Sequence, residues 1–332
     1  MLRIGINGFG RIGRTLYRLL LDRPDIEVVQ VNDVANIQVL AHLLRYDSVH
    51  GVLRSRHQVE GDLLRIDSTT TVFTTGASPV QIDWSRQKVD LVVECSGKFR
   101  DRESLEGHLK SGVKKVILSV PPSDNSIPMV VLGVNEEVLV NAGSIVSNAS
   151  CTTNSAAPLV QVINNMACIE KAYITTVHSY TSDQRLHDAP HTDLRRARAA
   201  AQSIVPTTTG AAKAITGIFP ELEGHIGGCG IRVPVPDGSL TDITFILDRD
   251  LSEEQINKEF ERASGEELKG ILGYTEDPIV SLDILESPYS VLFDAQLTSA
   301  LGKMVKVVGW YDNEYGYSNR LVDLIDRCAK RL

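Results

Sequence analysis

The sequence predicts an α/β protein in which a doubly wound parallel sheet precedes an α+β half with a mixed or antiparallel sheet. In the first half, short apolar strands alternate with amphipathic helical stretches, a pattern typical of βαβ units. In the second half, β-rich runs follow one another with few helices between them. The length of 332 residues fits about two domains.

Composition narrows the class of protein further. The chain is 42% hydrophobic and 23% charged, which is the range of globular proteins and excludes a disordered or collagen-like polymer. Its 34 Lys and Arg against 42 Asp and Glu give a formal net charge of −8. Because binding to nucleic-acid phosphates requires clustered basic residues, and the densest run is only Arg195, Arg196 and Arg198, we expect no nucleic-acid partner.

The cysteines and the N-terminus indicate the compartment. The five cysteines are odd in number and widely spaced, without a CxxC motif, so they predict neither a disulfide framework nor a metal site. The opening MLRIGINGFG lacks the layout of a signal peptide, and no apolar run approaches the roughly 18–20 residues that span a bilayer. We therefore expect a cytoplasmic protein without a membrane partner.

The elements of the first half follow from its apolar runs and their spacing. Strands are expected at Leu2–Asn7, Ile26–Asn32, Val89–Cys95, Val116–Val120 and Ser144–Ser147, and helices at Gly13–Leu21 and Ile37–Leu44. In the second half, strands are expected at Tyr173–Tyr180, Ile231–Val235, Leu240–Leu247, Ile279–Leu285 and Val305–Tyr311. A capping box of Ser252 and Gln255 predicts a helix to about Ala263, and apolar spacing predicts another over the tail, Ser318–Leu332.

A glycine-rich turn follows the first strand. The run Gly8-Phe9-Gly10-Arg11-Ile12-Gly13 opens a helix, and Asp33 ends the next predicted strand 20 residues beyond Gly13. Glycines let the backbone approach a pyrophosphate at a helix N-terminus, and the acid accepts hydrogen bonds from ribose hydroxyls. The pattern predicts a dinucleotide site, and the alternative is a tight turn that needs glycines for packing alone.

Cys151 is the candidate nucleophile. It lies in Ser150-Cys151-Thr152-Thr153-Asn154, between a strand and an apolar stripe at Leu159, Val162, Ile163 and Met166 with helical spacing. A helix start favours the thiolate form of a cysteine. The other four cysteines, Cys95, Cys168, Cys229 and Cys328, are interpreted as small buried apolar residues.

His178 is the candidate base, because it stands at the end of an apolar strand in Val177-His178-Ser179-Tyr180-Thr181. An imidazole that faces a helix-start cysteine can activate it. The alternative, a buried histidine with satisfied hydrogen bonds, stays open at this point because sequence spacing does not measure distance.

Several long motifs are distributed over essentially the whole chain: NGFGRIGR, SNASCTTN, VHSYT, DLRRARAAA, PTTTGAAKA, RVPVP and WYDNEYGYSNR. In the same order along the chain, they resemble the motifs of phosphorylating glyceraldehyde-3-phosphate dehydrogenases. The resemblance implies that glyceraldehyde 3-phosphate, NAD and inorganic phosphate become 1,3-bisphosphoglycerate and NADH. It assigns Cys151 to the thiohemiacetal and thioester and His178 to proton transfer.

The resemblance also assigns binding residues. Substrate and inorganic phosphate would be held by Thr181 and Arg232 in one anion pocket and by Ser150, Thr152, Arg196, Thr209 and Gly210 in a second, with some exchange between the sets. NAD would be held by Gly8, Gly10, Arg11, Ile12, Gly13, Asp33, Gly97, Ser119 and Asn313. For Arg196, the alternative is a solvated surface charge.

The sequence departs from the family's pattern at two places, and two alternative functions are considered. Ser155 stands where the family often has a second cysteine, and the loop Thr74–Pro79 lacks the usual Arg-Asp-Pro. One rival is erythrose-4-phosphate dehydrogenase, which typically replaces the residues matching Thr181, Thr209 and Gly210. The other is an NAD-binding interaction protein without catalysis, against which an intact Cys151 and His178 argue.

The resemblance further implies a domain plan and an assembly. Residues 1–149 would form the NAD-binding domain, with the C-terminal helix at 315–332 packing back on it, and residues 150–314 the catalytic domain. The polar loop at about Ser182–Ser203 would lie at a subunit interface of a homotetramer. Asp33, followed by Val34, favours NAD, with NADP as a weaker alternative.

Overall fold

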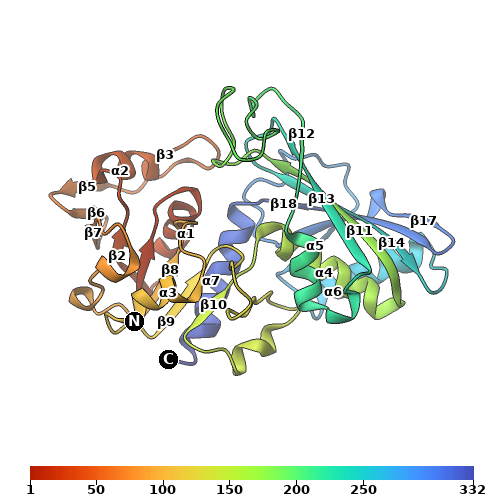
Figure 1. Cartoon of the computed structure of the whole chain (residues 1–332), viewed down its shortest axis with the longest axis horizontal. Helices are drawn as coiled ribbons and strands as arrows, with labels where there is room; N and C mark the ends of the chain where they lie inside the picture. Colours follow the sequence, from red (N-terminus) through yellow and green to blue (C-terminus); the bar gives the residue numbers. More distant parts are fainter. The chain divides into compact units, whose positions relative to one another are not determined.

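The computed structural model describes residues 1–332, which divide into two compact units. The first unit comprises Met1–Val130, Glu136–Ala149 and Ser318–Leu332, and the second Val131–Asn135 and Ser150–Tyr317. In Figure 1, most of helix α7 (Tyr315–Ala329), at the blue end of the chain, lies with the red to yellow elements of the first unit. None of the helices combines the length and the apolar character that crossing a membrane requires.

The first unit is built on an eight-stranded sheet of order β10-β9-β8-β1-β2-β7-β6-β5. Its parallel strands are β1 (Leu2–Asn7), β2 (Ile26–Asn32), β7 (Thr69–Thr74), β8 (Leu91–Glu94), β9 (Lys115–Leu118) and β10 (Ile145–Ser147). The hairpin strands β5 (His57–Glu60) and β6 (Leu63–Ile66) extend this sheet antiparallel beyond β7. The chain leaves β1 on one side and returns to β8 on the other, so strand order reverses at β1. Ligands of doubly wound sheets bind at such a reversal, beyond the carboxyl ends of the strands.

Helices α1 (Arg11–Leu21), α2 (Ile37–Arg45) and α3 (Arg102–Leu109) belong to this unit, with a two-stranded ribbon of β3 (Tyr46–Asp47) and β4 (Gly51–Val52). The bounds of β1 and β2 match the prediction, whereas α1 begins two residues earlier than expected, with Gly10 as its N-cap. One core cluster packs around the fully buried Trp84 and Leu105. The hairpin and β7 were not predicted.

The second unit is built on a mixed sheet of order β12-β13-β11-β14-β18-β16-β15, with β17 beside β18. The strands are β11 (Ile169–Ser179), β12 (Val205–Thr207), β13 (Ile226–Val233), β14 (Ser239–Leu247), β15 (Leu272–Thr275), β16 (Val291–Asp294), β17 (Ser299–Leu301) and β18 (Met304–Tyr311). Pairs β11–β13 and β15–β16 are parallel and the others antiparallel, which confirms the predicted mixed sheet.

Helices α4 (Cys151–Met166), α5 (Ala211–Ile218) and α6 (Glu253–Gly265) belong to the second unit. Leu159 of α4 packs against β18 at Gly309, where an added Cβ would lie 2.3 Å from Val291 Cγ2. Thus the glycine in β18 allows the close packing at this point. The capping box that opens α6 is present, with both the Ser252 and Gln255 side chains engaged.

The predicted strand at Ile279–Leu285 is wrong, because this segment forms turns. Asp283 accepts a hydrogen bond from the Val280 backbone N–H through Oδ2 (2.8 Å), and its own N–H donates to the Val280 carbonyl (2.9 Å). An aspartate that bonds to nearby backbone competes with sheet pairing. Val280 and Leu282 are consequently exposed.

Candidate active site

The glycine-rich turn lies at the carboxyl end of β1. Gly8 has φ +92°, and a Cβ there would lie 2.5 Å from the Ser96 backbone nitrogen. A Cβ at Gly13 would lie 2.2 Å from the Gly8 carbonyl oxygen, whereas a Cβ at Gly10 would meet nothing within 4 Å. Packing therefore accounts for Gly8 and Gly13 but not for Gly10, whose open surroundings fit a ligand that approaches the backbone.

Asp33 lies beside this turn. Its Oδ2 accepts a hydrogen bond from the Phe9 N–H (2.7 Å) and its Oδ1 one from the Ala35 N–H (2.9 Å). Asp33, Gly8, Gly10, Asn7 and Asn32 line a cavity of about 190 Å³. This cavity lies at the reversal of strand order, where a doubly wound sheet binds its ligand.

The remaining predicted residues of the first unit surround this region less directly. Arg11 forms an ion pair with Asp47 (Nη1–Oδ2 2.6 Å), and Ile12 is half-buried in the first turn of α1. Gly97 has φ +69° with open space around it, and Ser119 is buried, with its N–H bonded to the Glu94 carbonyl. Neither Gly97 nor Ser119 lines the cavity, although Ser96 and Lys98 do.

A buried carboxylate, which the sequence analysis missed, forms hydrogen bonds with two residues that line this cavity. Glu94, fully buried at the end of β8, accepts hydrogen bonds from Asn7 Nδ2 (2.5 Å), His108 Nε2 (3.0 Å) and the Ser96 N–H (2.7 Å). Trp84 Nε1 donates to His108 Nδ1 (3.0 Å), so the hydrogen of the neutral imidazole is on Nε2. An acid at the end of the apolar run Leu91-Val92-Val93 was the signal that could have identified this residue.

Helix α4 begins at Cys151, which confirms the predicted helix start. Ala149 has φ +54°, which is strained for a residue with a Cβ, and it turns the chain from β10 into the helix. Ser150 is the N-cap, and its Oγ accepts a hydrogen bond from the Thr153 N–H (3.0 Å). The local sequence thus fixes the half-buried Cys151 at the positive end of the α4 dipole.

His178, at the end of β11, faces this cysteine. Its Nε2 lies 3.4 Å from Cys151 Sγ, and its Nδ1 lies 2.7 Å from the Ser179 carbonyl oxygen. Arg232 Nη1, which can only donate, also lies 2.9 Å from Nδ1 and donates to the same carbonyl oxygen (2.9 Å). In the tautomer with the hydrogen on Nδ1, the Ser179 carbonyl oxygen accepts that hydrogen as well, and Nε2 presents its lone pair to the sulfur. The thiol and the imidazole are therefore arranged for proton transfer.

The surroundings of this pair affect both ionisations. Burial raises the pKa of Cys151, while the Arg232 charge and the Thr152 backbone N–H oppose that rise. Burial, followed by the Arg232 charge, lowers the pKa of His178 to about 3. His178 is thus neutral at physiological pH and can accept a proton.

Two further side chains of β18 and the loop that follows it belong to this site. Tyr311 Oη lies 3.0 Å from Thr152 Oγ1 and 2.9 Å from Thr176 Oγ1, and its ring meets the His178 ring edge-on. Asn313 Oδ1 accepts hydrogen bonds from Ser179 Oγ (2.9 Å) and Ser239 Oγ (2.6 Å). These two hydroxyls fix the orientation of the Asn313 amide. The sequence analysis did not assign Tyr311.

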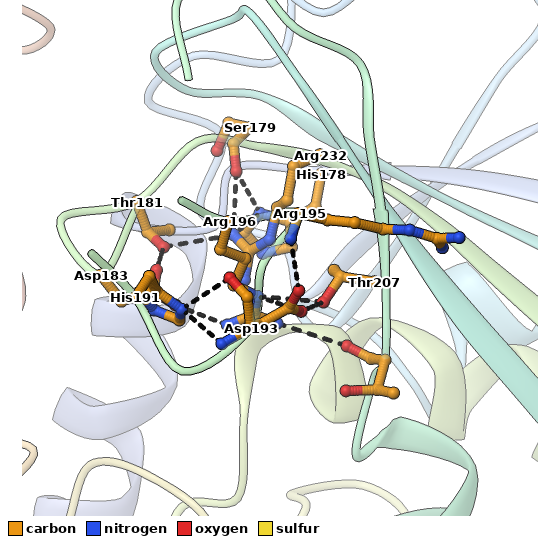
Figure 2. Close-up of polar contacts among 11 residues, drawn as sticks. His178, Ser179, Thr181, Asp183, His191, Asp193, Arg195, Arg196, Thr207 and Arg232 are labelled. Carbon is orange, nitrogen blue, oxygen red and sulfur yellow. Dashed lines mark hydrogen bonds and ion pairs between the residues drawn. The ribbon is translucent and has the colours of Figure 1, made fainter. Parts of the chain in front are cut away.

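The residues predicted to bind anions come from several elements of the second unit. Arg232 Nη1 lies 3.3 Å from Thr181 Oγ1 and 2.9 Å from His178 Nδ1. Arg196 Nε donates to Thr207 Oγ1 (3.0 Å) (Figure 2). Ser150 and Thr152 lie at the start of α4, while Thr209 Oγ1 accepts from the Ala211 N–H and Gly210 caps α5.

Arg196 is not a solvated surface charge. Its side chain is 19% exposed, against 67% for Arg198, and Figure 2 shows Arg195 extended away from the group. Arg196 forms ion pairs with Asp183 (Nη1–Oδ2 2.6 Å) and Asp193 (Nε–Oδ2 3.6 Å). The sequence analysis missed both acids. Their positions within three residues of Thr181 and Arg196 were the available signal.

The remaining cysteines differ from the prediction in one case. Cys328 is buried and Cys95 and Cys229 are half-buried, but Cys168 is exposed, so its interpretation as a buried apolar residue is wrong. Cys168 follows the end of α4, where its N–H donates to Asp248 Oδ1. Ser155, in place of the family's second cysteine, is buried and bonds to Thr241 Oγ1 (2.9 Å).

A doubly wound unit with a glycine-rich turn, together with a unit that carries a thiol–imidazole pair at a helix start, is typical of NAD-dependent dehydrogenases that use a cysteine nucleophile. The family models agree: glyceraldehyde 3-phosphate dehydrogenase, NAD binding domain, matches residues 2–102, and the C-terminal domain of the same family matches residues 150–313. The chain belongs to the glyceraldehyde-3-phosphate dehydrogenase family, as an NAD-dependent, phosphorylating enzyme.

Full-length relatives support the same assignment. Glyceraldehyde-3-phosphate dehydrogenase of Geobacillus stearothermophilus is 49% identical over 331 residues, covering 99% of this chain and 98% of the relative. Glyceraldehyde-3-phosphate dehydrogenase 1 of Bacillus subtilis is 47% identical over 331 residues, with the same coverage. Glyceraldehyde-3-phosphate dehydrogenase 2 of Streptomyces avermitilis is 48% identical over 326 residues, covering 97% of each chain. The resemblance stated from the motifs is confirmed.

Proposed function

We propose that this chain oxidises glyceraldehyde 3-phosphate, with NAD and inorganic phosphate, to 1,3-bisphosphoglycerate and NADH through a covalent intermediate on Cys151. The observation that carries this proposal is the 3.4 Å separation of Cys151 Sγ and His178 Nε2. Sγ adds to the aldehyde carbon, and the carbonyl oxygen takes up the thiol proton through the imidazole, which gives a thiohemiacetal. The half-buried cysteine at the start of α4 supplies the nucleophile.

Proton transfer in the later steps also falls to His178. Its Nε2 accepts the hydroxyl proton of the thiohemiacetal as that group is oxidised. NAD, when bound, supplies the hydride acceptor that completes the oxidation to a thioester. An oxygen of inorganic phosphate then attacks the thioester carbon, the C–S bond breaks, and the imidazolium of His178 returns a proton to the sulfur.

The open space at Gly10 and the Asp33 carboxylate beside the turn fit a dinucleotide. The residues that would hold NAD are Gly8, Gly10, Arg11, Ile12, Gly13, Asp33, Gly97, Ser119 and Asn313. The Asn313 Nδ2 group would donate to the amide of the nicotinamide, because the Ser179 and Ser239 hydroxyls already donate to Asn313 Oδ1.

The anion pockets are part of the proposal. Thr181 and Arg232 would bind one phosphoryl group, while Ser150, Thr152, Arg196, Thr209 and Gly210 would bind the other, with exchange between the sets. Guanidinium groups, hydroxyls and helix N-termini are suitable donors for phosphate oxygens. The retained Thr181, Thr209 and Gly210 favour the triose phosphate over erythrose 4-phosphate.

We propose that residues 1–149 with the helix at 315–332 form the NAD-binding domain and that residues 150–314 form the catalytic domain. The matches of the NAD binding domain model to residues 2–102 and of the C-terminal domain model to residues 150–313 support this division. A homotetramer is consistent with the exposed apolar side chains Leu186, Leu194 and Ile204 on and beside the loop 182–203. Five free cysteines are consistent with the cytoplasm.

Burst kinetics test the mechanism. The enzyme is mixed with NAD and glyceraldehyde 3-phosphate in the absence of phosphate, and NADH absorbance is followed. We expect about one NADH per active site, then near-arrest, and multiple turnovers when phosphate is added. The same assay with erythrose 4-phosphate measures substrate choice, and Cys151→Ser is the control that should give no burst while it still binds NAD. Rapid turnover without phosphate, or a burst from Cys151→Ser, would contradict the mechanism.

A further inference from the structure

Asp183 contacts one residue from each of the two anion pockets. Thr181 Oγ1 donates a short hydrogen bond to Asp183 Oδ1, and Arg196 Nη1 forms an ion pair with Asp183 Oδ2 at 2.6 Å. Figure 2 shows Asp183 next to Thr181, on the loop that follows β11. One carboxylate thus holds a hydroxyl of the first pocket and a guanidinium of the second.

These contacts use the hydrogens that a phosphate would need. A threonine hydroxyl has one hydrogen, and that of Thr181 is directed to Asp183. Arg196 directs Nη1 to Asp183 and Nε to Thr207 Oγ1, whose own hydroxyl donates to Asp193 Oδ2 (2.8 Å). The Arg196 Nη2 group also donates to the Thr208 carbonyl oxygen (3.4 Å). A phosphate oxygen, which accepts hydrogen bonds, therefore finds the Thr181 hydroxyl and three of the five N–H groups of Arg196 already occupied by acceptors of the chain.

The local charge is balanced as well. The two guanidinium groups of Arg196 and Arg232 are matched by the carboxylates of Asp183 and Asp193. Burial raises the pKa of Asp183, but the Thr181 hydroxyl and the Arg232 and Arg196 charges outweigh burial, so the net shift is downward and Asp183 is ionised at neutral pH. With His178 neutral, an incoming phosphate meets a site with little net positive charge.

Asp183 differs from Asp193 in how firmly it is held. Asp193 accepts a backbone hydrogen bond from the Arg195 N–H through Oδ1 in addition to its bond from Thr207. The hydrogen bonds of the Asp183 carboxylate are those to the Thr181 and Arg196 side chains, and its side chain is 44% exposed. A rotation toward solvent would hydrate the carboxylate and release both partners without breaking a backbone contact.

We propose that Asp183 is an internal anion that competes with phosphate for Thr181 and Arg196 and so sets the affinity of the anion pockets. This inference rests on the proposed function, because it takes these two residues as phosphate ligands. Asp183 then weakens the binding of phosphate, whereas a residue that only orients Arg196 would strengthen it. A weaker affinity of the two anion pockets for phosphoryl groups favours release of a doubly phosphorylated product.

The test is the affinity of inorganic phosphate for the NAD-saturated protein, measured by isothermal titration calorimetry. Asp183→Asn and Asp183→Ala should each lower the dissociation constant by about threefold or more. The asparagine amide could itself donate to phosphate, whereas alanine cannot, so agreement of the two variants isolates the loss of the competing acceptor. Asp188→Asn is the matched control, because Asp188 is an exposed acid of the same loop and forms an ion pair with Arg198 (Nε–Oδ2 2.9 Å). The affinity of this variant for phosphate should equal that of the wild type.

The KM for phosphate should fall in parallel in the steady-state assay, and melting temperature and NAD affinity check that each variant is folded. Unchanged or weaker phosphate binding in both Asp183 variants would overturn the inference, since a residue that only orients Arg196 would weaken binding when removed. The wild-type burst with glyceraldehyde 3-phosphate tests the proposed function separately. If the wild type gives no burst but both Asp183 variants still bind phosphate more tightly than the wild type, the proposed reaction is overturned and the competition by Asp183 is retained.

Discussion

The Arg232 guanidinium lies 2.9 Å from Nδ1 of His178, so a permanent positive charge stands against the imidazole that faces Cys151. A positive charge favours the thiolate and disfavours the imidazolium. Arg232 therefore acts in the same direction on both members of the pair: it lowers the pKa of the thiol and the pKa of the imidazole. The residue proposed to bind a phosphoryl group therefore also lowers the pKa of the nucleophile and the pKa of its base, next to the larger effect of burial.

Replacing Arg232 should move the ionisation of Cys151 to higher pH. In Arg232→Gln the positive charge is lost, so the pH at which alkylation reaches half its maximal rate should rise relative to wild type. Iodoacetamide is the suitable reagent because it is uncharged. The control is Arg195→Gln, since Arg195 extends away from this group, and its profile should match wild type. An unchanged profile in Arg232→Gln would show that the guanidinium does not act on the thiol.

Removing the base should reduce turnover strongly. We expect His178→Asn to lower kcat by about 10²–10⁴-fold, which is the usual contribution of general acid–base catalysis. NAD binding should stay within a few-fold of wild type, because His178 is not one of the residues proposed to hold NAD. His187→Asn, an exposed histidine on the following loop, is the control. A loss of less than about tenfold would argue against the role of His178 as base.

Asp47 should stabilise the first unit in a pH-dependent way. Burial raises the pKa of its carboxyl, but the His50 N–H, the Arg11 side chain and the Val49 N–H together lower it from 3.8 to about 2. Because the folded-state pKa is the lower one, this stabilisation is complete above the unfolded-state pKa and is lost as pH falls through about 2.

At pH 7 the shift corresponds to about 2 kcal/mol, so Asp47→Asn should lower the free energy of unfolding by about that amount. Urea unfolding from pH 7 down to about pH 3 is the measurement, and the difference between wild type and variant should shrink as pH falls. The exposed Asp62→Asn serves as the control. A difference that is independent of pH would place the effect in packing rather than in ionisation.

Cofactor choice follows from Asp33. Its carboxylate is held beside the turn by the Phe9 and Ala35 N–H groups, where it would repel a 2′-phosphate, and the Val34 side chain offers no donor. We expect kcat/KM for NAD to exceed that for NADP by at least roughly tenfold, or about 1.4 kcal/mol. Asp33→Ser should narrow this ratio, mainly through a gain with NADP. Equal or better efficiency of the wild type with NADP would refute the prediction.

The sequence alone determined the features that depend on neighbours along the chain. The bounds of β1 and β2, the start of α4 at Cys151 and the capping box of α6 all follow from apolar spacing and from side chains that bond to adjacent backbone. The same local reasoning was wrong at Ile279–Leu285, where Asp283 forms two hydrogen bonds with the Val280 backbone and the segment forms turns instead of a strand. The long motifs also identified the family, because their residues are read directly.

Only the tertiary structure decided which distant residues meet. Cys151 and His178 are 27 positions apart and Glu94 and Asn7 are 87 apart, and spacing carries no information on such distances. Sheet register brings Arg232 beside His178, since β11 and β13 pair in parallel with these two residues as partners. The sequence predicted Thr181 and Arg196 as ligands of phosphate. The contact of Asp183 with Thr181 is local, two positions along the chain, whereas its ion pair with Arg196, 13 positions away, depends on how the loop after β11 folds back.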